Sequence, residues 1–126
     1  MRGLDVEKKK LKCLIVEDER LAITMMERYI NSRSELELIG TAKDQDQFIQ
    51  LLTIYEPDII FLDIGIPPGD FSTFHELKFP KATQVVIVSA YNSVVYRNII
   101  GHHLLSELPK PITKSSFNRL IDHIVS

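Results

Sequence analysis

The sequence has 126 residues, of which 44% are hydrophobic and 25% are charged, and its formal net charge is −2. These values are ordinary for one soluble globular domain, and they argue against a domain whose main role is direct contact with nucleic acid. The single cysteine, Cys13, excludes an internal disulfide, and no apolar run approaches the ~18–20 residues of a membrane span, so we expect a cytoplasmic protein.

Charge is concentrated at the N-terminus. Residues 1–12 carry five basic and two acidic side chains, whereas the remainder carries ten basic and fifteen acidic ones. We interpret residues 1–10 as a basic, flexible leader that discourages pairing at the first strand, and residues 11–126 as the globular domain. A basic arm for an acidic partner is the alternative.

Short apolar runs alternate with helical patterns from Leu11 onward. The run Leu11–Val16 predicts a strand, and apolar residues at helical spacing predict a helix from Arg20 to about Ser32. Leu36–Ala42 predicts a shorter strand. Asp44 and Gln47 have the spacing of a capping box at the start of a second helix.

The second half of the chain continues this alternation. Asp58–Asp63 is apolar on both faces, which predicts a central parallel strand, and residues 65–70 predict a loop. We expect a weak helix over residues 71–79, a strand over Val85–Ser89 and a helix over residues 94–100. A fifth strand, His103–Leu108, and a last helix with the apolar stripe Phe117, Leu120, Ile121 and Ile124 complete the pattern.

Five strands interleaved with five helices predict an α/β fold, (βα)5. Right-handed crossovers then give a doubly wound five-stranded parallel sheet with helices on both faces. In such sheets the chemistry collects at the carboxyl ends of the strands. The side chains to inspect are therefore those that end the five predicted strands.

Polar residues end four of these strands. Glu17 and Asp18 follow the first, Asp63 ends the third, Ser89 ends the fourth and Lys110 follows the fifth. Three converging carboxylates favour a cation, and oxygen ligands suit Mg²⁺. An ionised aspartate can act as a nucleophile toward phosphorus, with a cation and a lysine neutralising the phosphoryl group and a serine hydroxyl donating to it.

Four motifs resemble the receiver domain of two-component response regulators. They are residues 14–19 (LIVEDE), residues 61–67 (FLDIGIP), residues 86–91 (VIVSAY) and Lys110-Pro111. The motifs occur in the family's order, and the resemblance covers residues 11–126. It implies a flavodoxin-like sheet with strand order 2-1-3-4-5.

The resemblance also implies a phosphorelay function. Asp63 would accept a phosphoryl group from a sensor histidine kinase or a phosphotransfer protein. The Mg²⁺ would be held by Glu17, Asp18, Asp63 and the backbone carbonyl of Gly65. The domain would then signal by a conformational change at a face formed by the fourth helix, fifth strand and fifth helix, through which it could form a homodimer. Such a domain is a phosphoacceptor rather than an enzyme.

Two further matches concern the phosphoryl group. The resemblance implies that Ser89 donates a hydrogen bond to it. Lys110 would form an ion pair with it, and a cis peptide bond would join this lysine to Pro111.

Several residues depart from the family pattern. Glu17 stands where aspartate is commoner, and Pro68 stiffens the loop after the acceptor. Glu107 occupies the position of the usual switch aromatic, and residues 101–116 contain no Phe, Tyr or Trp, which leaves Tyr91 as a speculative substitute. We also expect a truncated third helix, because the stretch from Asp63 to Ser89 is short.

These departures keep a second function open. The chain could be an interaction module that keeps the fold but signals without phosphorylation. A phosphatase of the haloacid dehalogenase type is disfavoured, because its general-acid aspartate would stand where Gly65 is found. The sequence does not decide between a stand-alone receiver and part of a longer, DNA-binding regulator.

Overall fold

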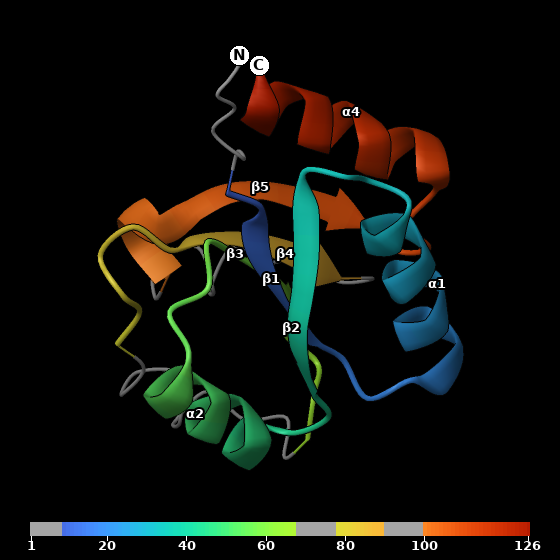
Figure 1. Cartoon of the computed structure of the whole chain (residues 1–126). Helices are drawn as coiled ribbons and strands as arrows, with labels where there is room; N and C mark the ends of the chain where they lie inside the picture. The colour runs from blue at the N-terminus through green and yellow to red at the C-terminus, as the bar shows by residue number, and fades with distance from the viewer. Residues whose placement is uncertain (1–8, 68–77, 90–99) are drawn as a thin grey trace.

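A computed structural model describes residues 9–67, 78–89 and 100–126 of the chain. Five strands form one sheet, and the segments between them wind back over its two faces (Figure 1). The strands are β1 (Leu11–Val16), β2 (Leu36–Ala42), β3 (Ile59–Asp63), β4 (Gln84–Ser89) and β5 (Leu104–Pro109). The helices within the described residues are α1 (Arg20–Asn31), α2 (Gln45–Ile54), α4 (Lys114–Val125) and the short 3-10 helix η2 (Gly101–His103).

All strand pairs are parallel, and the strand order is β2-β1-β3-β4-β5. This confirms the predicted doubly wound, flavodoxin-like sheet. The central strand β3 is buried along its whole length, as expected for a strand covered on both faces. The parallel registers bring the carboxyl ends of β1, β3, β4 and β5 to the same edge.

Each face of the sheet has its own hydrophobic core. On one face, α1 and α4 contribute Met26, Ile30 and Phe117 to a cluster with alternate strand residues. On the other face, Phe48 of α2 packs into the second cluster, and its ring lies 6.3 Å from that of Phe79. Figure 1 shows the corresponding arrangement, with α2 on the opposite side of the sheet from α1 and α4.

The start of α2 corrects one detail of the sequence prediction. Asp44 caps the helix as expected, because its Oδ1 accepts the Gln47 N–H at 2.8 Å. The Gln47 side chain, however, accepts the N–H of Lys43 rather than that of Asp44. The long amide side chain reaches one residue beyond the cap, so the capping box is only half formed. A complete capping box occurs instead at α4, between Thr113 and Ser116.

The fifth strand begins one residue later than predicted, at Leu104. Gly101 has φ of 60°, a conformation that favours glycine, and it begins the turn η2 that includes His103. Both His102 and His103 lie in this turn, and their ring centroids are 4.1 Å apart. The Nδ1 atom of His103 lies 2.8 Å from the carbonyl oxygen of Thr83.

Some predictions fall on residues that the structure does not describe. The predicted helices over 71–79 and 94–100 lie almost wholly outside the described residues, as do Pro68 and Tyr91. The predicted leader over residues 1–10 falls mainly outside them as well. Ile100, at the end of the second of these helices, is buried in the core.

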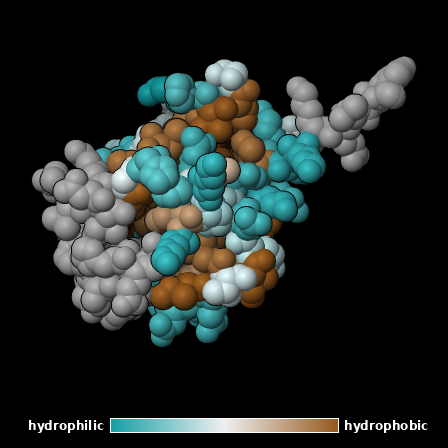
Figure 2. All heavy atoms as spheres, turned by 90° about the vertical axis from the view of Figure 1, so that its left-hand side faces the viewer, coloured by the Kyte–Doolittle hydropathy of each residue, from teal (hydrophilic) through white to brown (hydrophobic). Residues whose placement is uncertain are grey.

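The surface is mixed in character. Figure 2 shows one face of the molecule, where hydrophilic side chains lie among smaller hydrophobic areas. Within the described residues no helix is long and apolar enough to cross a membrane. Cys13 is fully buried, and this burial raises the pKa of its thiol to about 12, as is typical of a cysteine that packs as a small apolar side chain.

Candidate functional site

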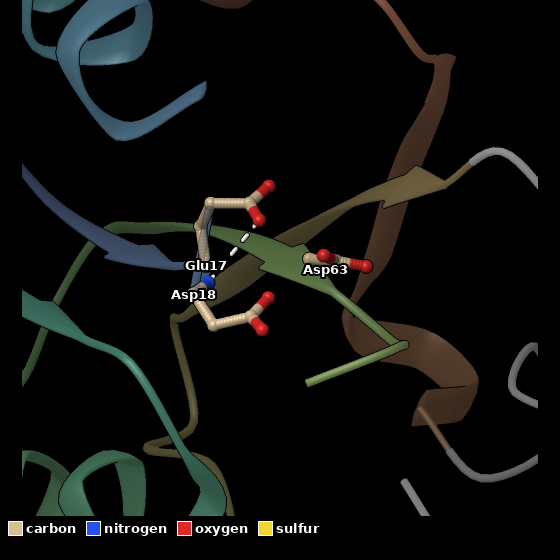
Figure 3. A group of neighbouring side chains, drawn as sticks. All are labelled: Glu17, Asp18 and Asp63. Atoms are coloured by element: carbon tan, nitrogen blue, oxygen red, sulfur yellow. Dashed lines mark hydrogen bonds between the residues drawn. The ribbon is translucent and has the colours of Figure 1, made fainter. Parts of the chain in front are cut away.

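Three carboxylates converge at the carboxyl edge of the sheet. Glu17 and Asp18 follow β1, and Asp63 is the last residue of the neighbouring strand β3 (Figure 3). Because Val16 of β1 pairs with Leu62 of β3, the residues that follow these two positions lie side by side. One carboxylate oxygen from each of the three acids lies within 4.8 Å of the other two.

Glu17 is buried, and hydrogen bonds fix its carboxylate. Its Oε2 accepts the backbone N–H groups of Asp18 at 3.1 Å and Glu19 at 3.0 Å, and its Oε1 lies 2.7 Å from the ammonium group of Lys110. Burial raises the pKa of Glu17, and the charge of Asp63 adds to this, although the bonds from Lys110 and Glu19 act in the opposite direction. A nearby cation would favour the ionised form of this carboxylate.

Lys110 connects the acidic cluster to β5. It follows β5, its N–H donates to the Ser89 carbonyl at 3.2 Å, and its Nζ lies 3.0 Å from Oδ2 of Asp63. Partial burial alone would lower the pKa of Lys110, but its hydrogen bonds to Glu17 and Asp63 outweigh burial and raise it. The lysine therefore stays charged, and the peptide bond to Pro111 is cis, as the resemblance implied.

Asp63 uses both of its carboxylate oxygens. Oδ1 accepts the N–H of Gly65 at 2.9 Å, and Oδ2 accepts a hydrogen bond from Lys110. The first bond holds the turn after β3 against the end of the strand, so the backbone of Gly65 lies beside the carboxylate. The Asp63 side chain is 11% exposed, so it is largely but not completely shielded from solvent.

Ser89 and Glu107 lie on neighbouring strands at the same end of the sheet. Ser89 is buried at the end of β4, one residue beyond Val88, which pairs with Asp63. Both Ser89 and Glu107 line a cavity of about 170 Å³ together with Ile87, Leu108 and Pro109. Glu107 pairs in register with Ile87, which belongs to the apolar cluster on that face of the sheet.

The predicted site residues are thus brought together. Glu17, Asp18, Asp63 and Lys110 form a connected cluster, and Gly65 and Ser89 lie against it through the contacts above. The three acidic side chains offer only oxygen atoms as metal ligands. Oxygen ligands suit Mg²⁺, whereas zinc prefers nitrogen and sulfur ligands. Lys110 supplies a positive charge that contacts both Glu17 and Asp63.

Sequence reasoning missed one contact beside this cluster. The helical spacing of α1 indicates nothing about Tyr29 beyond the apolar face of the helix, yet its hydroxyl donates to the Ile112 carbonyl at 3.0 Å, two residues after Lys110. A tyrosine in a stripe of aliphatic residues is the signal that was available, because a buried phenol needs a hydrogen-bond partner. The sequence could not show which partner that would be.

The comparison with protein families agrees with this geometry. The family model described as the response regulator receiver domain matches residues 13–123. The chain belongs to this family. The receiver domain resemblance drawn from the four motifs is therefore confirmed.

Curated relatives of this receiver domain are longer proteins. One is protein-glutamate methylesterase/protein-glutamine glutaminase 2 of Shewanella oneidensis, 36% identical over 121 residues, which cover 91% of this chain and 34% of that protein. Another is the oxygen regulatory protein NreC of Staphylococcus aureus, 26% identical over 108 residues, which cover 79% of this chain and 49% of that protein. The receiver domain thus spans about a third to a half of these relatives.

Solved structures share the fold along nearly the whole chain. The response regulatory domain of MrkE from Klebsiella pneumoniae has a TM-score of 0.78 at 25% identity, covering 91% of this chain and 95% of that one. The response regulator domain of CheB from Thermotoga maritima has a TM-score of 0.70 at 18% identity, covering 93% and 92% of the two chains. The second likeness concerns the fold alone.

Proposed function

We propose that Asp63 accepts a phosphoryl group from a phosphohistidine of a sensor kinase or phosphotransfer protein, and that this modification drives signalling. The observation that carries the proposal is the position of the Asp63 carboxylate: it lies 3.0 Å from the ammonium group of Lys110, and one of its oxygens lies within 4.8 Å of a carboxylate oxygen of both Glu17 and Asp18. The Asp63 carboxylate is the nucleophile in this arrangement. Lys110 supplies a fixed positive charge beside it, and the three carboxylates offer a place for a divalent cation.

The transfer requires few protein groups. An oxygen of the Asp63 carboxylate forms a bond to phosphorus while the bond between phosphorus and the donor's imidazole nitrogen breaks, and the electron pair stays on that nitrogen. The products are an acyl phosphate on Asp63 and a neutral imidazole, because the proton on the other ring nitrogen of the phosphohistidine stays with the leaving imidazole. Lys110 would then pair with a phosphoryl oxygen, and the Ser89 hydroxyl would donate to another.

The acidic cluster suits a magnesium ion. Glu17, Asp18 and Asp63 would hold it, with the Gly65 carbonyl as a further ligand, because hard divalent cations prefer carboxylate and carbonyl oxygens. When bound, Mg²⁺ offsets the negative charge that accumulates as phosphate approaches three acids. Without such a cation, Glu17 and Asp18 would repel the incoming phosphoryl group.

The proposal is tested by mass spectrometry of the intact protein. The chain is incubated with a small acyl phosphate or phosphoramidate, with Mg²⁺ or with a chelator. We expect one phosphoryl group per chain with Mg²⁺, and a much slower gain with the chelator. No gain with either class of donor, in protein that is folded by circular dichroism, would refute the proposal.

Lys110→Ala should separate metal binding from phosphoryl transfer. Removing the ammonium group frees Glu17 and Asp63 from a competing cation, so the variant should bind Mg²⁺ more tightly by about 1 kcal/mol, or about fivefold. Phosphorylation should nevertheless slow about a hundredfold, because a fixed charge at the developing phosphoryl group is lost. Magnesium titration measures the affinity, and the time course of intact mass measures the phosphorylation rate. The control is Lys114→Ala, which removes an exposed lysine from the first turn of α4. Weaker magnesium binding by the Lys110 variant would contradict this account.

One observation favours the second candidate function, an interaction module that signals without phosphorylation. Glu107 lines a cavity with Ser89 at the position where the family carries an aromatic switch residue. If this function holds, Asp63→Asn leaves affinity for the partner protein unchanged, both with and without a phosphodonor. If phosphorylation is the signal, the donor changes the affinity of the unsubstituted chain and has no effect on Asp63→Asn.

A further inference from the structure

The segment that carries Lys110 runs from the end of β5 to the start of α4. Its first residue is held by the backbone bond from the Lys110 N–H to the Ser89 carbonyl, and its last by the capping box at Thr113. Between these two points, the Tyr29 hydroxyl donates to the carbonyl of Ile112 at 3.0 Å. This hydrogen bond joins the segment to α1, across 83 residues of sequence.

The tyrosine ring is itself firmly placed. Tyr29 is 8% exposed, and its ring centroid lies 5.4 Å from that of Phe117 on α4. The Phe117 ring lies 5.6 Å from that of Phe61, which is two residues before Asp63 on β3. The phenol is therefore anchored to the same framework that carries the acceptor carboxylate.

The segment has space on its α1 side. A cavity of about 470 Å³ lies between α1 and this segment, with Met25 and Met26 on one side and Lys110, Pro111 and Ile112 on the other. Close packing therefore does not by itself hold Lys110 toward the carboxylates. A directional hydrogen bond across the edge of this cavity would limit the movement of the segment.

We propose that Tyr29 is a positioning residue for Lys110: its hydroxyl holds the Ile112 carbonyl, so that the ammonium group stays against Glu17 and Asp63. This role rests on the proposed function of Asp63 and deepens it, because it makes the rate of phosphoryl transfer depend on a side chain that touches neither donor nor acceptor. Tyr29→Phe removes the hydroxyl and leaves the aromatic ring in place.

The primary test is the phosphorylation kinetics of Tyr29→Phe with a small phosphodonor and saturating Mg²⁺. We expect the maximal rate constant to fall about fivefold, the equivalent of one neutral hydrogen bond, while the half-saturating donor concentration stays unchanged. The control is Tyr55→Phe, which removes the hydroxyl of a tyrosine that is 38% exposed just after α2 and should leave the rate unchanged. An unchanged rate in Tyr29→Phe would overturn the proposal.

A double-mutant cycle separates positioning from a general structural role. If Tyr29 acts through Lys110, adding Tyr29→Phe to Lys110→Ala slows phosphorylation no further than Lys110→Ala alone. An equal fivefold loss in both backgrounds would show that the hydroxyl supports the fold and not the lysine, and would overturn the proposal.

Magnesium titration gives a readout that does not depend on phosphoryl transfer. A less restrained Lys110 competes less well for the carboxylates, so Tyr29→Phe should bind Mg²⁺ about twofold more tightly, and this gain should vanish in the Lys110→Ala background. If the unsubstituted chain takes up no phosphoryl group, the proposed function fails. The magnesium affinities of the two single variants and the double variant then test by themselves whether Tyr29 positions Lys110. Equal magnesium affinity with and without the hydroxyl would then overturn the positioning role.

Discussion

Asp63→Asn should abolish phosphoryl uptake while the domain stays folded. Asparagine keeps the shape of the side chain and an oxygen that can accept the Gly65 N–H, but its amide is not a nucleophile toward phosphorus. The variant loses its ion pair with Lys110 and also loses the repulsion from Glu17 and Asp18, so these changes partly cancel. We expect the thermal midpoint to move by only about a few degrees. The measurement is the gain in intact mass with phosphodonor and Mg²⁺, beside a thermal unfolding curve.

A matched control for this substitution is Asp46→Asn. Asp46 is an exposed acid in the first turn of α2, away from the acidic cluster, and its replacement changes the net charge by the same amount. This control should take up one phosphoryl group at the unsubstituted rate. Phosphorylation of Asp63→Asn at a comparable rate would mean that another residue is the acceptor.

Phe117→Ala should have the largest effect on stability. Phe117 is fully buried at the centre of the core between α1, α4 and the sheet, and its ring lies against those of Tyr29 and Phe61. Replacing a buried phenylalanine by alanine removes apolar contacts and leaves a cavity, at a cost of about 3–5 kcal/mol. This cost is a large part of the free energy of unfolding of a whole domain, which is typically about 5–15 kcal/mol. Chemical denaturation followed by circular dichroism measures the free energy of unfolding.

Phe117→Leu serves as the comparison for this core position. Leucine keeps most of the apolar volume, so we expect a loss of about 1 kcal/mol. The comparison on the surface is Val125→Ala at the end of α4, where the side chain is 39% exposed and its truncation should cost about 0.5 kcal/mol or less. A similar small loss for Phe117→Ala would contradict the central place of this ring.

The sheet was predictable because its strands are short, apolar and separated by helical patterns. Leu11–Val16 and Asp58–Asp63 lie within one residue of the observed β1 and β3, and the parallel arrangement follows from the alternation. The start of β5 likewise lies one residue from its predicted position, His103. This boundary depends on the turn at Gly101, whose positive φ cannot be inferred from the spacing of apolar residues. The same turn brings the ring centroids of His102 and His103 to 4.1 Å from each other.

The charged members of the site were predictable from their place at strand ends. Glu17, Asp18 and Asp63 follow runs whose parallel pairing forces their carboxylates to one edge. The contribution of Tyr29 could not be found in this way, because its partner is a backbone carbonyl from the far end of the chain. The presence of a tyrosine indicates that a buried phenol needs a hydrogen-bond acceptor. Which group accepts the bond follows only from the fold, which places the segment after β5 against α1.

The measurement that tests the central claim most directly is the location of the phosphoryl group. The phosphorylated chain is treated with borohydride, which reduces an aspartyl phosphate to homoserine, and the digested peptides are sequenced by mass spectrometry. The account predicts homoserine at position 63 alone, in samples phosphorylated with Mg²⁺, and unmodified Asp63 in samples treated with a chelator. Homoserine at position 18, or a stable phosphoryl group on a histidine with Asp63 unmodified, would contradict it.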